Sequence, residues 1–283
     1  MKEKITPCLW FNGDAKEAAA LYCSAFSAAR ITSQSPFVTG IEIGGQHITL
    51  LDGGPQYRPN ASISFYVGCE TIAEFDQIWD ALSASGTVVA APASTPWSDR
   101  YGYVTDKFGV AWQLGVQAAR DITQKVTPYF MFTGNQYGKA EEAIKLYSTV
   151  FKGASVAGDA VRYGKNDAGE HAGYVRHVEM NLLNQKFMLA DVAEGAVGFT
   201  EGVSLTVHCE SQEEVDYYWT KLTQGGKESM CGWLKDRFGV SWQIIPTVLT
   251  KLMSDPSKAG KAAKAFMTMR KLDIEQIVQA SLA

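Results

Sequence analysis

A ten-residue segment occurs twice in this chain. Asp106-Lys-Phe-Gly-Val-Ala-Trp-Gln-Leu-Gly115 is matched by Asp236-Arg-Phe-Gly-Val-Ser-Trp-Gln-Ile-Ile245. Six of the ten positions are identical, and the Lys/Arg and Ala/Ser exchanges are conservative. One copy alone would predict a turn that leads into a strand. Two copies indicate that the chain contains the same module twice.

The segments that precede the two decapeptides also correspond in order. Val126–Gly134 matches Ile5–Gly13, and each is a short apolar run, typical of a strand, that ends in a turn. Ala140–Phe151 matches Ala15–Phe26, with apolar residues at the three- and four-residue spacing of an amphipathic helix. We expect Asp14 to cap the first of these helices.

The remaining pattern predicts a β-α-β-β-β motif that occurs twice in each module. The helices that follow the fourth strand of each module are predicted over Thr71–Ser85 and Val215–Leu222. The largest insertion, Gly153–Gly173, predicts a hairpin peculiar to the second module. Further strands are expected, from alternation or from hairpin turns, over Phe37–Ile43, Gln46–Leu51, Ser62–Val67, Thr87–Val89, Tyr101–Thr105, Val110–Leu114, Val175–Leu183, Lys186–Asp191 and Val203–Cys209.

These matches divide the chain into four parts. Module 1 is expected over residues 1–118, a linker over 119–125, module 2 over 126–246, and a helical extension over 247–283. In the extension, helices are predicted over Ala259–Met269 and Asp273–Leu282, with Asp273 as an N-cap. The apolar stripe of the last helix must be buried, either on the body of the protein or on a second chain.

Composition excludes several classes of protein. A net charge of -4 and an isoelectric point near 5.6 give no electrostatic footprint for nucleic acid. The sequence contains no apolar run of about 18 residues that could span a membrane, and its N-terminus lacks the apolar core of a secretory signal. The five cysteines are scattered and odd in number, as expected for reduced thiols in a cytoplasmic protein.

Several segments resemble a known family. They include Thr127–Phe132, Leu146–Phe151, Cys209–Trp219 and Cys231–Pro246 in module 2, with weaker counterparts such as Leu51–Pro55 in module 1. The pattern is similar to the PhnB-like branch of the vicinal oxygen chelate superfamily, which includes glyoxalase I, extradiol dioxygenases and bleomycin-resistance proteins. The resemblance implies an α+β fold in which tandem paired βαβββ modules form cupped mixed sheets. It also implies that the chain is a fused pseudo-dimer, either monomeric or a homodimer.

Metal-dependent members of this superfamily take ligands from the strand faces inside the cup. The resemblance carries the first-strand ligand position onto Pro7 and Pro128, which cannot ligate through their side chains. It carries the hairpin position onto Glu42 and Glu179, and the last-strand position onto a glutamine. A catalytic metal site needs about three strong nitrogen or oxygen ligands. The resemblance therefore implies an incomplete site.

One set of residues could rescue a metal site in one half only. His177 lies two residues before Glu179 on the same strand face, and Gln243 holds the last-strand position of the same module. His208 could line the same cup. The alternative is that both histidines are ordinary edge or surface residues. The residues expected to bind a ligand are Glu42, Ser64, Tyr66, Gln113, His177, Glu179, Thr206 and Gln243.

The decapeptide itself is interpreted as structural. If Gln113 points into the cup, Trp112 points away from it onto the helices, because neighbouring side chains of a strand face opposite sides. Trp112 and Trp242 are then core residues. Asp106 and Asp236 are predicted to fix their turns rather than to act as bases.

The resulting prediction is a protein that binds a small molecule in a sheet-lined cup without a complete metal site. No cofactor is predicted, and catalytic residues are not identified. The alternative is a lyase, isomerase or dioxygenase that depends on a divalent metal; a third is an interaction protein that uses its C-terminal helices. An S-adenosylmethionine-dependent ubiquinone methyltransferase is not supported, because no glycine-rich loop follows a strand and opens a helix.

Overall fold

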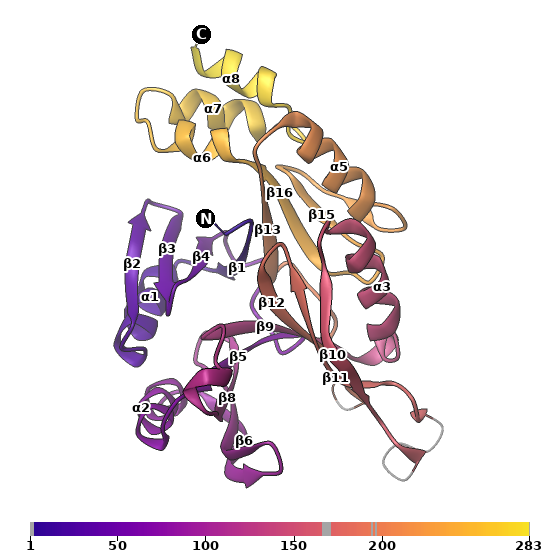
Figure 1. Ribbon diagram of the computed structural model, residues 1–283. Helices are drawn as coiled ribbons and strands as arrows, with labels where there is room; N and C mark the ends of the chain where they lie inside the picture. Colours follow the sequence, from indigo (N-terminus) through magenta and orange to yellow (C-terminus); the bar gives the residue numbers. More distant parts are fainter. Residues whose placement is uncertain (1–2, 166–170, 194, 196, 283) are drawn as a thin grey trace. The chain divides into compact units, whose positions relative to one another are not determined.

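The structure, a computed structural model, describes residues 3–165, 171–193, 195 and 197–282. The chain divides into two compact units. The central unit contains residues 7–203, and the terminal unit contains residues 1–6 and 204–283. Each unit is described below by itself, and its elements can be followed along the chain in Figure 1.

The chain repeats a βαβββ motif, as predicted, and the α+β class is confirmed. The first motif contains β1 (Ile5–Phe11), α1 (Ala15–Ala25), β2 (Ala29–Gln34), β3 (Val38–Ile43) and β4 (Gln46–Asp52). The second contains β5 (Ile63–Cys69), α2 (Ile72–Ser83), β6 (Thr87–Thr95), β7 (Ser98–Thr105) and β8 (Ala111–Val116). The third contains β9 (Val126–Phe132), α3 (Ala140–Val150), β10 (Ser155–Arg162), β11 (Val175–Leu182) and β12 (Gln185–Asp191).

The fourth motif lies in the terminal unit and is followed by the C-terminal helices. It contains β13 (Val203–Cys209), α5 (Gln212–Leu222), β14 (Lys227–Glu228), β15 (Trp233–Lys235) and β16 (Ser241–Pro246). The helices are α6 (Thr247–Met253), α7 (Ala259–Phe266) and α8 (Ile274–Leu282). The 3-10 helices η1 (Ala119–Asp121) and η2 (Gly134–Gln136) flank β9.

The central unit contains an eight-stranded mixed sheet in the order β10-β11-β12-β9-β5-β8-β7-β6. The pairs β12–β9 and β5–β8 are parallel, whereas β5 and β9 are antiparallel. The β5–β9 pair joins the second motif to the third, with Ile63 opposite Phe130 and Ser64 opposite Tyr129. One continuous sheet therefore combines the second half of the first sequence repeat with the first half of the second repeat.

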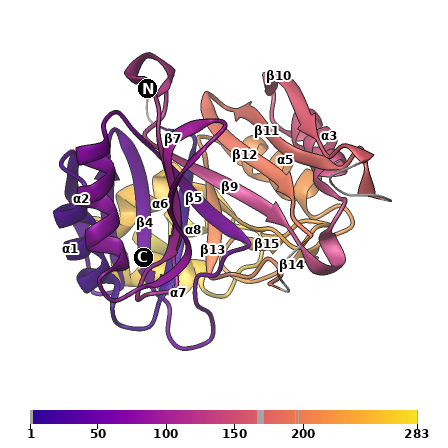
Figure 2. The same ribbon diagram turned by 90° about the horizontal axis from the view of Figure 1, so that it is seen from below.

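Helices cover one face of the strands in the central unit. α2 packs on β7 and β8, and α3 packs on β11 and β12. α1 packs on β3 and β4, and Figure 2 shows it beside α2. On the helix side, the strands contribute fully buried residues such as Phe65, Leu114 and Phe130. The opposite face of the sheet is left for polar and aromatic side chains.

Some strands differ from the sequence prediction. β2 was not predicted, because almost all of its residues are exposed and show no apolar alternation. β6 extends to Thr95 and β7 begins at Ser98, so this hairpin is longer than expected. β10 lies in the predicted insertion and pairs with β11, which follows the insertion. β2 pairs with β3 in the same way, so the prediction of a hairpin peculiar to the second module is wrong. Residues 166–170 of the insertion lie outside the described residues.

The repeated decapeptide forms a turn that its aspartate holds together. Asp106 Oδ1 accepts hydrogen bonds from the backbone N–H groups of Phe108 and Val110, at 2.9 and 3.0 Å. Its Oδ2 accepts from Trp112 Nε1 at 2.9 Å and from the Tyr22 hydroxyl at 2.8 Å. Burial raises the pKa of Asp106, and these four donors act against that rise. The predicted structural role of Asp106 is confirmed.

The second copy of the turn, in the terminal unit, has the same geometry. Asp236 Oδ1 accepts from the backbone N–H groups of Phe238 and Val240, and its Oδ2 accepts from Trp242 Nε1 at 3.0 Å. Both Trp112 and Trp242 have no exposed surface. The prediction that the two tryptophans are core residues is therefore confirmed.

The start of α1 is capped by a residue distant in sequence. Asp14 makes no side-chain cap, contrary to the prediction. Asp52, at the end of β4, accepts hydrogen bonds from the backbone N–H groups of Gly13 and Ala15 at 2.8 and 3.1 Å. Asp191, at the end of β12, caps α3 in the same way through the N–H groups of Gly138 and Ala140. In both motifs, a carboxylate at the end of the neighbouring parallel strand thus accepts hydrogen bonds from the backbone N–H groups at the start of the helix.

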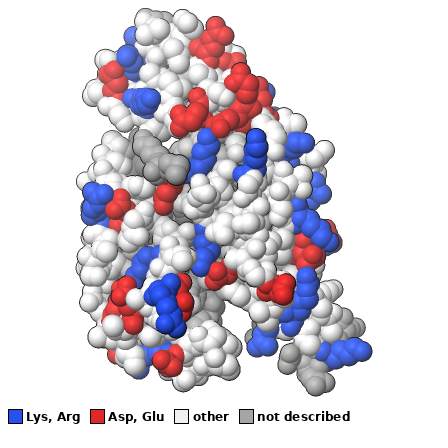
Figure 3. Space-filling view, viewed as in Figure 1, with Lys and Arg blue, Asp and Glu red and all other residues white. Residues whose placement is uncertain are grey.

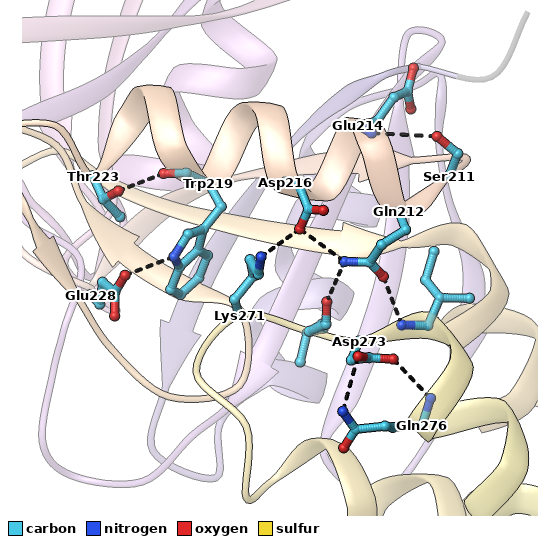
Figure 4. Close-up of polar contacts among 12 residues, drawn as sticks. Ser211, Gln212, Glu214, Asp216, Trp219, Thr223, Glu228, Lys271, Asp273 and Gln276 are labelled. Atoms are coloured by element: carbon cyan, nitrogen blue, oxygen red, sulfur yellow. Dashed lines mark hydrogen bonds and ion pairs between the residues drawn. The ribbon is translucent and has the colours of Figure 1, made fainter.

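The C-terminal helices pack on the terminal unit itself. Leu249, Leu252, Ala262, Leu272 and Ile277 form their buried core, with Ile245 of β16 against it. Figure 4 shows how α5 holds this segment: Gln212 Nε2 donates to the Leu272 carbonyl, and its Oε1 accepts from the Ile274 N–H. Lys271 pairs with Asp216 at 2.6 Å. Ile277 of α8 is therefore buried against α6 and α7, whereas Leu282, at the end of the predicted apolar stripe, is 65% exposed.

Asp273 caps α8, as predicted. Its Oδ1 accepts from the Gln276 N–H at 2.9 Å. No helix among the described residues is long and apolar enough to cross a membrane. Figure 3 shows acidic and basic side chains intermixed over the face that it presents, in keeping with the small net charge of -4.

We predict that Asp106→Ala destabilises the protein by about 4 kcal/mol, because it leaves two side-chain donors and two backbone donors unsatisfied in the core. Tyr22→Phe is the matched control: it removes one of the four hydrogen bonds and should cost about 1 kcal/mol. Urea unfolding measures both changes. Equal costs for the two variants would contradict the assigned role of Asp106.

We also predict that Asp52→Ala costs about 1 kcal/mol through loss of the α1 cap, and that Asp14→Ala costs less than half of that. Denaturant unfolding compares the two variants under the same conditions. A larger loss for Asp14→Ala would show that the cap lies where the local sequence pattern placed it.

Candidate functional site

A cavity of about 530 Å³ opens on the helix-free face of the central sheet. This volume is typical of a small-molecule site. Strands near both ends of the sheet contribute to its wall, so the sheet curls into a cup. Its lining residues are Tyr66, Pro96, Trp97, Tyr101, Gln113, Gln117, Tyr129, Val161, Arg176, His177, Glu179 and Met188.

The two sequence repeats share this cup. Tyr66 and Gln113 come from the first repeat, whereas His177 and Glu179 come from the second. The strand register brings them together: Tyr66 lies opposite Gln113, and Glu179 lies opposite Met188, which lies opposite Tyr129. The β5–β9 pair places Ser64 opposite Tyr129 and so joins the two sets.

Gln113 is tied to the first-repeat side of the cup. Its Oε1 accepts from the Tyr101 hydroxyl at 2.6 Å, and its Nε2 donates to Ser64 Oγ at 2.8 Å. Ser64 is fully buried and lies beneath Gln113, so it orients the amide. Burial raises the pKa of Tyr101 to about 12, so its hydroxyl remains a donor at neutral pH.

His177 and Glu179 have partners from neighbouring strands. His177 Nδ1 lies 3.2 Å from the Tyr129 hydroxyl. Glu179 Oε2 lies 2.8 Å from the ammonium of Lys186 on β12. Burial lowers the pKa of His177, and the carboxylate of Glu179 acts in the opposite direction. The imidazole is therefore neutral at pH 7.

Glycine leaves room for one wall of the cup. A Cβ on Gly115 would lie 2.3 Å from the Tyr66 hydroxyl. Glycine at this position of β8 leaves room for the end of the Tyr66 side chain, and a larger residue would have to displace that ring. Burial raises the pKa of Tyr66 well above its usual range. Tyr66 is thus an uncharged aromatic wall.

The other sequence-predicted residues lie outside this cavity. Glu42 on β3 forms an ion pair with Arg30 at 2.9 Å, and the Arg30 hydrogen bond lowers the pKa of Glu42. Gln243 and Thr206 lie in the terminal unit, where they are opposite each other on β16 and β13. Gln243 Nε2 donates to Ser204 Oγ at 3.0 Å, which repeats the Gln113–Ser64 geometry.

Two more positions discussed above are placed by the structure. His208 Nε2 lies 2.8 Å from Thr6 Oγ1 within the terminal unit. Pro128 lines a separate cavity of about 10 Å³ together with Pro7, whereas Tyr129, one residue further along β9, lines the cup. The first-strand position of the cup is therefore Tyr129 and not Pro128, since adjacent residues of a strand face opposite sides.

Four residues of the site and its surroundings were not predicted from the sequence: Tyr101, Tyr129, Trp97 and Lys186. Tyr129 gave no signal of its own, because it lies between Pro128 and Phe130 on a strand that looks uniformly apolar and shows no alternation. Trp97 lies at the turn between β6 and β7, packs edge-on against Tyr101 and is 60% exposed. Lys186 could be recognised only from its position beside Glu179 across two strands.

Comparison with known proteins agrees with this architecture. The model of the family described as 3-demethylubiquinone-9 3-methyltransferase matches residues 3–115 and 124–245. The protein YjdN of Escherichia coli is 31% identical over 77 residues, which are 27% of this chain and 52% of YjdN. This chain thus spans about half the length of that relative.

Solved structures extend the comparison to the fold. A Bacillus cereus protein described as a putative 3-demethylubiquinone-9 3-methyltransferase, PhnB protein, is 29% identical, with a TM-score of 0.38, and the match covers 41% of this chain and 100% of that chain. Glyoxalase I from Zea mays is 12% identical, with a TM-score of 0.60 over 89% of this chain and 95% of that chain, and so shares the fold. The chain belongs to the family described as 3-demethylubiquinone-9 3-methyltransferase, whose model matches it twice along its length.

Proposed function

We propose that the cup of the central unit binds a small planar molecule without the help of a metal ion. The observation that carries this proposal is the ion pair between Glu179 and Lys186, at 2.8 Å. Glu179 is the only carboxylate that lines the cup within the described part of the chain. An ammonium group already neutralises it.

The donor set of the cup does not fit a metal ion. Gln113 offers an amide oxygen that is engaged by Tyr101, and His177 Nδ1 is engaged by Tyr129. The amide oxygen and the amide nitrogen of Gln113 are not strong ligands for Zn²⁺ or Fe²⁺. Among the described residues, no group of three or more His, Cys, Asp or Glu side chains could hold a metal ion. A metal ion at Glu179 would also lie beside the Lys186 ammonium, whose positive charge opposes it.

The aromatic walls favour a planar ligand. Tyr66, Tyr101, Tyr129 and Trp97 line the cavity, and Met188 forms part of its floor. Aromatic side chains bind flat rings through large contact areas and through offset or edge-to-face packing. Methionine adapts to irregular shapes at such a surface. The cup thus offers apolar contact with a few fixed polar groups, as small-molecule sites commonly do.

Two other activities have less support. A divalent-metal-dependent lyase, isomerase or dioxygenase would need about three strong ligands, whereas the cup offers only His177 and Glu179, with the ammonium of Lys186 beside the carboxylate. A methyltransferase activity, which the family description names, would call for an S-adenosylmethionine site. The repeated βαβββ motifs with mixed sheets differ from the open parallel sheet in which dinucleotide-like cofactors usually bind.

The proposal also includes the oligomeric organisation and the cellular compartment of the protein. We infer a fused pseudo-dimer, since each half of the chain carries two βαβββ motifs. The five cysteines are free, and three of them are buried, which supports a reducing compartment such as the cytoplasm.

The metal content of the protein tests this function. We expect protein purified without a chelator to contain no stoichiometric metal, and added Mn²⁺, Ni²⁺, Zn²⁺ or Fe²⁺ to leave its melting temperature unchanged. Lys186→Met is the matched variant: it frees the Glu179 carboxylate, so it should bind Zn²⁺ or Ni²⁺ more tightly than the unaltered protein does. Stoichiometric metal that is lost on Glu179→Ala would overturn the proposal.

The neutral state of His177 gives a pH prediction. Its folded pKa is lowered, so between about pH 6.5 and the folded pKa the unfolded chain binds more protons than the folded chain does. The contribution of the neutral imidazole to folding stability is therefore fully present above about pH 6.5, and it is lost as the pH falls towards the folded pKa. Glu179, Lys186 and the Tyr129 hydroxyl are the polar groups that face this ring from β11, β12 and β9.

We therefore expect the free energy of unfolding to fall more steeply from about pH 8 to about pH 5.5 in the unaltered protein than in His177→Gln, which cannot titrate there. Urea unfolding at several pH values measures the two slopes. Parallel curves for the two proteins would show that His177 does not titrate abnormally.

A further inference from the structure

His177 and Glu179 present neighbouring polar atoms to the cup. They are two residues apart on β11, so their side chains lie on the same face of the strand. Each uses one atom on a protein partner: Nδ1 of His177 on Tyr129, and Oε2 of Glu179 on Lys186. Within the described part of the chain, Nε2 of His177 and Oε1 of Glu179 have no hydrogen-bond partner, and both residues line the cavity.

The Tyr129 hydroxyl determines which nitrogen of His177 carries the proton. Burial raises the pKa of Tyr129, so the hydroxyl keeps its hydrogen. His177 Nδ1 is its one hydrogen-bond partner among the described residues. Tyr129 is half-buried, and an unpaired hydroxyl hydrogen at the wall of the cup is unfavourable, so we assign the hydroxyl as the donor to Nδ1. A neutral imidazole that accepts at Nδ1 carries its proton at Nε2.

We propose that Tyr129 holds His177 as the Nε2–H tautomer, so that the cup pairs a donor at His177 with an acceptor at Glu179 and takes a planar heterocycle with a neighbouring carbonyl and N–H. The edge of a lactam or an imide has this pattern. The carbonyl oxygen accepts from His177 Nε2, and the N–H donates to Glu179 Oε1. This inference rests on the proposed function, because the aromatic walls must first hold the ring.

The His177–Glu179 edge of the cup carries no net charge and so fits a neutral ligand group, whereas the Arg176 guanidinium lines another part of the cavity. The ammonium of Lys186 balances the carboxylate of Glu179, and His177 is uncharged. The rings of Tyr66 and Tyr129 are likewise uncharged. Polar recognition therefore depends on the directions of single hydrogen bonds, and a ligand that cannot complete both leaves a desolvated group unpaired.

Tyr129 acts through His177 and is therefore a positioning residue. Nitrogen-15 NMR of the histidine ring, in the absence of any ligand, reads the tautomer directly. We expect His177 to be almost entirely in the Nε2–H form at neutral pH, and Tyr129→Phe to introduce the Nδ1–H form. A ring that is protonated at Nδ1 in the unaltered protein would overturn the assignment of the donor.

Two probes of the same shape test the ligand class. We expect 2-quinolone, which has adjoining carbonyl and N–H groups, to bind about tenfold more tightly than N-methyl-2-quinolone, which lacks the donor. Isothermal titration calorimetry measures both affinities. In Glu179→Leu the preference should disappear, while N-methyl-2-quinolone still binds between the aromatic walls.

The outcomes separate this inference from the proposed function. Equal affinities for the two probes in the unaltered protein would overturn the lactam preference and leave the planar cup in place. Binding of neither probe would contradict both proposals. Tighter binding of N-methyl-2-quinolone would contradict the donor–acceptor pairing alone.

Discussion

The antiparallel pairing of β5 with β9 is the interaction on which the rest of the site depends. It runs through Ile63–Phe130, Ser64–Tyr129 and Phe65–Pro128, and it fuses two βαβββ motifs from different repeats into one sheet. One face of this pair carries Phe65 and Phe130 into the helix-covered core. The other face carries Tyr66 and Tyr129 to the cup, with Ser64 buried beneath Gln113. A shift of the register by one residue would turn the core side chains of one strand towards the cup and its cup side chains towards the core. Both the core packing and the cup would then be lost.

The aspartate turns and aspartate caps keep this sheet in shape. Asp106 ties the β7–β8 turn to Trp112 in the core and to Tyr22 of α1. Asp52 and Asp191 tie the ends of two strands to the helices that begin beside them. Each of these carboxylates is held by several donors and therefore makes a structural contribution. The cup keeps its one carboxylate, Glu179, for recognition, with Lys186 beside it.

Local patterns in the sequence predicted much of the fold. The repeated decapeptide placed Trp112 and Trp242 in the core and assigned Asp106 to a turn, because both features depend on residues within a few positions of each other. The sequence could not predict that Asp52 rather than Asp14 caps α1, since that cap depends on the end of a neighbouring strand. β2 was missed because an exposed edge strand has no apolar period.

The candidate site was harder to predict for the same physical reason. Gln113, His177 and Glu179 were identified as candidates, but nothing in the spacing shows that residues from different repeats line one cavity. The pairing of Lys186 with Glu179 follows from the register of β11 and β12, and the pairing of Tyr129 with His177 follows from that of β9 with β12. Side-chain contacts of this kind depend on the order of the strands in the sheet, which cannot be predicted from the spacing of residues in one sequence.

One measurement tests most directly whether the two repeats share a single binding site. Backbone amide chemical shifts can be mapped while N-methyl-2-quinolone is added to the full chain. We expect the signals of Gln113 and Gly115 on β8 to shift together with those of His177 and Glu179 on β11, with one common affinity. Shifts confined to residues of a single repeat, or saturating at two different concentrations, would contradict it.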